Sequence, residues 1–478
     1  KMGYGILSYG AYIPPIRLKR EAILEAIGWA VPGVRGLAFG ERSVASWDED
    51  SVTMAVEAAR NCLLDIKEVP TSLTLASTTF PFADRSNSGI VADALNLPVS
   101  ILTEDAFGSR RAGTSALVKN FLGSTNSLLL ASESREAKPG STQEMLYGHG
   151  AAALLLGEGE TLADIISVES VHEDLIDQYR AVDTKFDYAL EERWVREEGW
   201  LKIVPEAIGT ALRKANLGVD DIDKLIVHGG AGAARSLSKK IGIESSKLAD
   251  ALQENVGDCG AAHPLLMVGS VLEKSNPNEV IMIIGFGQGT DVIIMKTNDK
   301  ITIKNSQKGI SIHLKNRRPI DNYALYLSLR GHIDIDFGLR SERDNRTALS
   351  AYYRKRKEIS GLLGGRCVKC GTLQFPKSLI CVSCGSSEPQ REESLSGLVG
   401  RVKSFTEDWL AYTPFPPYIY GNVEFDGGAN MMLEFTDFKV GDVKVGDEVR
   451  MLFRVKDYDD KRKFRRYFWK PAPLLIDV

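Results

Sequence analysis

Four cysteines have the types and spacing of a metal site. Cys367 and Cys370 form one C-x2-C pair, Cys381 and Cys384 form a second, and ten residues separate the pairs. A two-residue gap lets both thiolates of a pair turn toward one point, and two such pairs provide the tetrahedral sulfur coordination that Zn2+ prefers. Two disulfides or a redox-active C-x-x-C are the alternatives, but the doubled motif favours zinc. We predict a closed structural site that does no chemistry itself.

A second group of residues could carry covalent chemistry. Cys259 lies in a glycine-rich turn four residues before His263, and His228 ends a strand-like apolar run. A cysteine beside a histidine can form a nucleophile and base. The simpler interpretation, which we favour for Cys259, is a small buried residue in a tight turn. His228 is either a site residue or a histidine whose hydrogen bonds are satisfied at a strand end.

Composition limits the class of protein. The chain has 478 residues, which predicts roughly three domains, and it is 44% hydrophobic and 26% charged, as in a water-soluble globular protein. Its formal charge of -4 gives no overall attraction to nucleic acid or anionic membranes. No apolar run is long enough for a membrane span, and the N-terminus lacks a signal-peptide pattern. Because free thiolates need a reducing compartment, we expect a cytoplasmic protein without membrane partners.

The first 298 residues alternate short apolar runs with amphipathic stretches, which predicts an α/β fold with a weak internal repeat. Each half reads as a helix, a short spacer and a buried strand. The helix and strand are Ser51–Asp65 and Leu73–Ser77 in the first half, and Val204–Leu217 and Lys224–His228 in the second. We place the halves at residues 1–160 and 161–298 and expect them to pack face to face.

The remaining chain changes character twice. Residues 299–360 are rich in charge and predict a surface connector, residues 361–390 contain the zinc motif, and residues 391–478 predict a small all-β barrel of the OB type. Its five expected strands are Leu398–Phe405, Tyr418–Phe425, Asn430–Phe435, Glu448–Val455 and Tyr467–Trp469. The basic, aromatic stretch Lys461–Lys470 could bind single-stranded nucleic acid, but we favour a last strand with solvated charges.

Several segments resemble a known family. GYGILSYGAYIPPIRL, SWDEDSVTMAVEAARNCL and VGDCGAAHPLL resemble archaeal and bacterial 3-hydroxy-3-methylglutaryl-CoA (HMG-CoA) synthases of the thiolase superfamily, over most of residues 2–298. FPKSLICVSCGS and YIYGNVEFDGGANMMLEFTD resemble the zinc-ribbon and OB-fold (DUF35) modules that accompany thiolases and such synthases as partner subunits. The resemblance implies a duplicated thiolase fold in αβαβα layers, followed by a zinc ribbon and an OB barrel.

The resemblance also implies which positions would do chemistry. In the synthases a cysteine at a helix N-terminus is acylated, and a glutamate, a histidine and an asparagine assist. In this chain the cysteine position holds Arg110, the glutamate position Thr78 and the asparagine position Asp258, while the histidine is retained as His228. An arginine cannot be acylated in this role. Arg110 could instead form an ion pair with Asp258 that seals the site, or bind a carboxylate or phosphate of a ligand.

These implications lead to three functional expectations. The first is a subunit without its own nucleophile that pairs with a complete thiolase in a superfamily-type dimer and aids binding of a coenzyme A thioester during Claisen-type carbon–carbon chemistry. The second is an active acyl-CoA C-acyltransferase or synthase that uses Cys259 with His263 or His228. The third is an OB-fold nucleic-acid binder, which the near-neutral charge disfavours.

Overall fold

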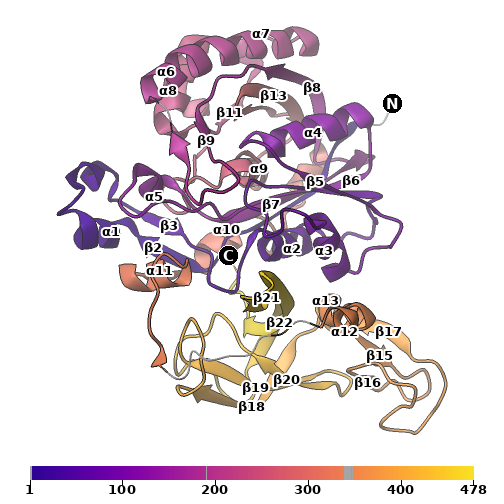
Figure 1. Ribbon diagram of the computed structural model, residues 1–478. Helices are drawn as coiled ribbons and strands as arrows, with labels where there is room; N and C mark the ends of the chain where they lie inside the picture. The colour runs from indigo at the N-terminus through magenta and orange to yellow at the C-terminus, as the bar shows by residue number, and fades with distance from the viewer. Residues whose placement is uncertain (1–2, 190, 339–345, 347, 478) are drawn as a thin grey trace.

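The computed structural model describes residues 3–189, 191–338, 346 and 348–477. Its largest sheet has nine strands (Figure 1). Their order across the sheet is β11 (Lys224–Val227), β12 (Val280–Phe286), β13 (Gly289–Thr297), β8 (Ala163–His172), β1 (Tyr4–Tyr12), β7 (Gly150–Glu158), β6 (Ser127–Glu133), β4 (Ser72–Ala76) and β5 (Leu102–Ala106).

This sheet is two smaller sheets joined at a narrow seam. Only Gly5 and Ile6 of β1 pair with β8, opposite Asp164 and Ala163. On one side β4 pairs in parallel with both β5 and β6, and on the other β11 pairs in parallel with β12. The predicted strand Leu73–Ser77 corresponds to β4, and Lys224–His228 corresponds to β11.

Helices separate and cover the two sheets in the layers predicted from the resemblance. The middle layer holds α4 (Ala112–Gly123) and α9 (His263–Leu272), which pack with strands of both halves into one apolar core. One outer layer holds α2 (Ser51–Cys62) and α3 (Asn87–Ala94), and the other holds α7 (Val204–Ala215) and α8 (Gly230–Ile241). Asp50 caps α2 by accepting hydrogen bonds from the backbone of Val52 and Thr53.

The connector does not lie simply on the surface as a solvated face. Its strand β14 (Arg318–Ile320) pairs in parallel with β2 (Ile16–Lys19), which pairs with β3 (Glu41–Ser43). Ile312 and Tyr326 of the connector are buried. Apolar residues between the charged ones pack this segment against the first region. The high charge of the segment concealed these residues when only its composition was considered. Its helices are α10 (Ser311–Lys315), α11 (Tyr323–Leu329), α12 (Leu349–Arg354) and α13 (Arg356–Ser360).

The C-terminal part forms two small sheets below the layered region in Figure 1. The first comprises β16 (Leu373–Gln374), β15 (Leu363–Arg366) and β17 (Arg391–Ser394) around the cysteine motif. The second runs β20 (Asn430–Glu434), β19 (Tyr418–Phe425), β18 (Gly400–Asp408), β21 (Glu448–Asp459) and β22 (Phe464–Pro473). The backbone N–H of Thr436 donates to Pro471, 2.9 Å away, and brings the two edge strands together as the OB prediction requires.

Short elements complete the described chain. They are α1 (Arg20–Ile27), α5 (Thr142–Leu146), β9 (Gln178–Tyr179), β10 (Tyr188–Ala189), α6 (Glu192–Trp194) and a π-helical turn, Val195–Ile203. Single turns of 3-10 helix lie at Pro32–Leu37, Val219–Asp221, Ser245–Lys247, Gly260–Ala262 and Asp299–Thr302. Within the described ranges, every helix is too short or too polar to cross a bilayer.

Candidate functional site

Arg110 lies at the entrance to the middle layer, just before α4, and forms ion pairs with two carboxylates. Its Nη2 is 2.9 Å from Asp177 and its Nη1 is 3.2 Å from Asp258. Burial lowers the pKa of Arg110, but Asp258 and Asp177 outweigh it and raise this pKa above its ordinary value. A permanently charged guanidinium therefore occupies the position where the resemblance implies a nucleophile.

Asp258 is the centre of this cluster. Its Oδ1 accepts hydrogen bonds from His228 Nε2 and from the backbone of Gly260, both at 2.8 Å, while Oδ2 faces Arg110. Burial raises the pKa of Asp258, but His228 and then Arg110 lower it well below its usual range. The carboxylate is ionised, so it would repel an enolate at the place where the synthases have an amide donor.

Cys259 and His263 lie close together, but not as nucleophile and base. The backbone N–H of Cys259 donates to His263 Nδ1 at 3.1 Å, and His263 Nε2 bonds to the carbonyl of Ala251 at 2.9 Å. Both ring nitrogens are thus engaged with the main chain. Burial raises the pKa of the Cys259 thiol well above its ordinary value, with Asp258 adding to the effect, and it lowers the pKa of His263 to about 4. This geometry favours the structural interpretation of the turn.

Thr78 faces a buried carboxylate that sequence reasoning missed. Its Oγ1 donates to Glu133 at 2.8 Å and accepts from Arg135 at 2.8 Å, and its backbone N–H also bonds to Glu133. Burial raises the pKa of Glu133. Glu133 is the last residue of β6, and no role was predicted for it from the sequence. A carboxylate at the end of a buried strand is the signal that could have drawn attention to it.

Three more charged residues at the centre were also missed, and they complete an ionic network. Arg135 contacts Asp187 at 2.6 Å, and the hydroxyl of Tyr147 donates to the same carboxylate at 2.6 Å. Asp177, the third of these residues, contacts Arg110. All three lie in loops or at strand ends, where no local sequence motif identified them. Paired charges therefore fill the place where the resemblance implies a reaction centre.

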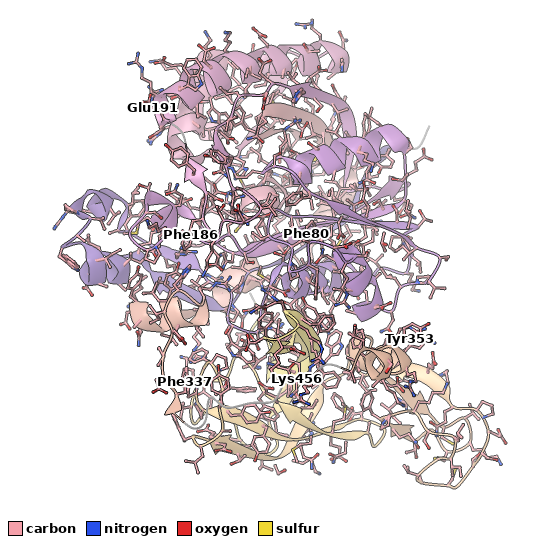
Figure 2. All side chains as sticks on the ribbon, in the orientation of Figure 1. Phe80, Phe186, Glu191, Phe337, Tyr353 and Lys456 are labelled. Carbon is pink, nitrogen blue, oxygen red and sulfur yellow. The ribbon has the colours of Figure 1, made fainter. Side chains whose placement is uncertain are left out.

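A large cavity runs from Thr78 toward the C-terminal barrel. It has a volume of about 1310 Å3, and Arg135, Phe80, Lys185 and Lys463 are among its lining residues. In Figure 2, Phe80 lies in the layered region and Lys456 marks the barrel below it. Val455 and Tyr458 of the barrel form part of the wall. The cavity therefore lies between the two regions and is bounded by residues of both.

The predicted zinc ligands come together. The Sγ atoms of Cys367 and Cys384 are 3.7 Å apart, those of Cys370 and Cys381 are 3.6 Å apart, and all four lie within 4.8 Å of one another. A tetrahedral ion with Zn–S bonds of about 2.3 Å requires sulfurs about 3.8 Å apart. A disulfide would need about 2.05 Å. The donor set fits a zinc ion held for structural purposes.

The stretch Lys461–Lys470 is less solvated than expected. Trp469 and Lys470 are buried, and Lys470 Nζ contacts Asp48 of the first region at 3.2 Å. Arg465 contacts Asp50 of the same region at 3.0 Å. The prediction of solvated charges was wrong here because the barrel packs against the layered region, and that packing is invisible in a local pattern.

A junction network of five charged residues joins the two regions. It consists of Asp48 and Glu49 from the first region and Asp437, Arg454 and Lys470 from the barrel. The side chain of Arg454 is fully buried and lies 3.0 Å from Asp48, 2.6 Å from Asp437 and 3.4 Å from Glu49. The backbone N–H of Val455 also donates to Asp48, 2.8 Å away.

Comparisons with known proteins agree with this architecture. The chain is 28% identical over 346 residues to the hydroxymethylglutaryl-CoA synthase of Methanobrevibacter smithii, covering 69% of this chain and 99% of that protein. It is 29% identical over 345 residues to the synthase of Methanothermobacter thermautotrophicus, again covering 69% and 99%. The synthase resemblance thus covers the layered region and leaves the C-terminal modules outside.

Solved structures share the fold at lower sequence identity. An HMG-CoA synthase complexed with CoA aligns with a TM-score of 0.62 at 18% identity, covering 72% of this chain and 95% of the other. The 3-oxoacyl-[acyl-carrier-protein] synthase III of Aquifex aeolicus aligns with a TM-score of 0.55 at 19% identity, covering 62% and 100%.

Two family models match the remaining modules. Residues 357–390 match the rubredoxin-like zinc ribbon domain of ChsH2, and residues 392–454 match its C-terminal OB-fold domain. The predicted fusion is therefore confirmed. The chain joins a region similar to HMG-CoA synthases, with the thiolase-type fold, to a zinc ribbon and an OB-fold domain of the ChsH2 kind.

Proposed function

We propose that this chain is a subunit, without its own nucleophile, of a heteromeric thiolase complex that makes or breaks carbon–carbon bonds in acyl-CoA thioesters. The observation that carries the proposal is Arg110, paired with Asp177 and Asp258 where the synthases have their acylated cysteine. Guanidinium cannot take up and release an acyl group. We infer that the ion pair of Arg110 with Asp258 seals the centre implied by the resemblance, which is the first of the two roles considered for Arg110.

An open sheet edge supports a role as a dimer partner. β5 ends the nine-stranded sheet, and Leu102 within it and Phe107 after it are 69% exposed. β5 also contains Glu104 and Asp105, but as the last strand of the sheet it has one unpaired edge, and such an edge can pair with another chain. We infer that a catalytically complete thiolase subunit binds at this edge in the superfamily-type dimer.

The cavity beside this edge supports a role in handling acyl-CoA. Lys185 and Lys463 line it, and among the described residues neither forms an ion pair with a carboxylate. Phe80 and Phe107, whose ring centroids are 6.3 Å apart, add apolar surface. Cations suit the phosphates of coenzyme A, and apolar rings suit an acyl chain. The OB module would thus help to bind the thioester near the partner.

Intact-mass spectrometry tests the absence of a nucleophile. The purified chain is incubated with acetyl-CoA, and the Cys259→Ser variant serves as a matched control. We expect no acetyl adduct on either protein. An adduct on the parent chain that is missing from the variant would overturn the proposal and would favour the alternative, an active acyltransferase that uses Cys259.

A second experiment tests the partner edge. Mixed with a thiolase from the same cells that retains its cysteine, the protein should form a complex in analytical ultracentrifugation. Phe107→Glu should abolish that complex, whereas Trp29→Glu, which changes an 87% exposed side chain elsewhere, should not. Equal behaviour of the two variants would contradict the proposed edge.

A further inference from the structure

A second cleft lies where the helix layer, the connector and the barrel meet. It has a volume of about 520 Å3, which is in the range of small-molecule sites. Its apolar wall includes Leu64, Leu95 and Met451. Its charged lining residues are Glu57, Arg60, Asp65 and Arg450, and His313 also lines it. This Arg450 cleft lies outside the charged centre and shares no lining residue with the larger cavity.

Arg450 is the cation of this cleft that lacks a counterion. Its Nε donates to the carbonyl of Pro473 at 2.9 Å, and among the described residues its guanidinium has no carboxylate within ion-pair distance. The other arginine of the cleft, Arg60, is paired with Glu57 at 2.9 Å. Partial burial and a missing partner are costly for a charged group, so this position is suited to an anion from outside the chain.

His313 provides an independent observation. It lines the same cleft, is 5% exposed, and its buried Nε2 has no hydrogen-bond partner among the described residues. Burial lowers the pKa of His313 to about 3, with Arg450 the next contributor, so the ring is neutral at pH 7 and is not a second cation. A buried polar atom without a partner usually marks a site for water or a ligand.

We infer that the Arg450 cleft binds a small carboxylate with a short apolar chain. A single arginine with free guanidinium hydrogens suits a planar monoanion, which it can hold with two hydrogen bonds. A phosphate dianion would meet one arginine without an ion-pair partner and would face the carboxylate of Asp65, whereas Glu57 is already paired with Arg60. The chain of the ligand would lie against Leu64, Leu95 and Met451, and His313 would offer a further polar contact at the head group.

Thermal shift measurements on the full chain test this inference, with hexanoate as the probe and with hexan-1-ol and inorganic phosphate at equal ionic strength as comparisons. Because a ligand that binds only the folded state raises Tm, hexanoate should raise it in a saturable way, and the comparisons should not. Loss of the two charge-assisted hydrogen bonds in Arg450→Gln should weaken hexanoate binding by about tenfold or more.

Two further variants keep the test decisive if Arg450→Gln folds poorly. Leu64→Glu adds a negative charge at a 40% exposed position of the wall and should also weaken binding. Arg401→Gln removes an exposed arginine of the same barrel, paired with Glu448 at 3.0 Å, and should leave binding unchanged. No shift with hexanoate, an equal shift with phosphate, or equal binding by Leu64→Glu and the parent chain would overturn the inference.

Discussion

Two arginines of this protein, Arg110 and Arg454, each form an ion cluster with several carboxylates, but in different parts of the molecule. Arg110 pairs with Asp177 and Asp258 inside the layered region and is 20% exposed. Arg454 is fully buried and pairs with Asp48 and Glu49 of that region and with Asp437 of its own barrel. The first ion cluster lies where the resemblance implies a reaction centre, and the second joins two modules. Both clusters pair a guanidinium with carboxylates, so the difference between their roles follows from where each cluster lies.

The zinc ribbon lies outside both networks. Removal of its metal is the change for which we expect the largest loss of structure. Removing the metal with a chelator should unfold the ribbon, because the free energy of binding zinc to four thiolates is also folding free energy. The layered region should keep its cooperative transition, since its core contains none of the four cysteines. Calorimetry and near-UV circular dichroism follow the two parts, and unchanged signals after chelation would contradict the metal assignment.

Arg454→Ala should be the most destabilising single substitution considered. It leaves Asp48, Glu49 and Asp437 without their shared cation, and breaking a buried ion pair on one side costs about 3–5 kcal/mol. Urea unfolding measures the loss. Arg401→Gln, an exposed pair on the same barrel, is the control and should change the free energy of unfolding by less than about 1 kcal/mol.

Arg110→Ala tests whether the partly solvated Arg110 cluster stabilises the fold less than the fully buried Arg454 cluster does. We expect a smaller loss, about 1–3 kcal/mol, since water can reach Asp258, whose side chain is 22% exposed. The variant should remain unable to form an acyl adduct. A loss of stability as large as that of Arg454→Ala would mean that the charged centre is as essential to the fold as the junction.

Glu49 gives the junction a pH dependence. Burial raises the pKa of Glu49 to about 7, although Arg454 opposes the shift. The folded state therefore retains a proton that the unfolded state has released, and this contribution to stability is lost as pH rises from about 4.5 to about 7. Glu49→Gln should reduce the fall in Tm over this range. Glu25→Gln, at an exposed position, should not reduce it.

Sequence patterns predicted helices and strands well where a short segment alone determines the structure. The range Tyr418–Phe425 matches β19 at both ends, and Ser51–Asp65 contains α2, because alternation and helical periodicity report burial within a short segment. The four zinc ligands were predicted for the same reason, since two short gaps bring the thiolates together.

The contacts that define the charged centre depend on distant segments. Arg110 and Asp258 are 148 residues apart, and Thr78 and Glu133 are 55 apart. The Arg110–Asp258 pair could be considered only because the resemblance placed both residues at one centre. Glu133 had no such guide, and the burial of Lys470 depended on packing between modules that no periodicity records.

The main-chain bond from Val455 to Asp48 and the charges around it have a dynamic consequence. Swinging the barrel away would separate Arg454 and Lys470 from Asp48 and Glu49 and would leave them only the carboxylates of the barrel itself, Asp437 and Glu434. These contacts therefore favour a barrel that stays in place against the layered region. If the proposed function holds, the opening that admits a thioester would come from loops at the cavity or from the proposed partner.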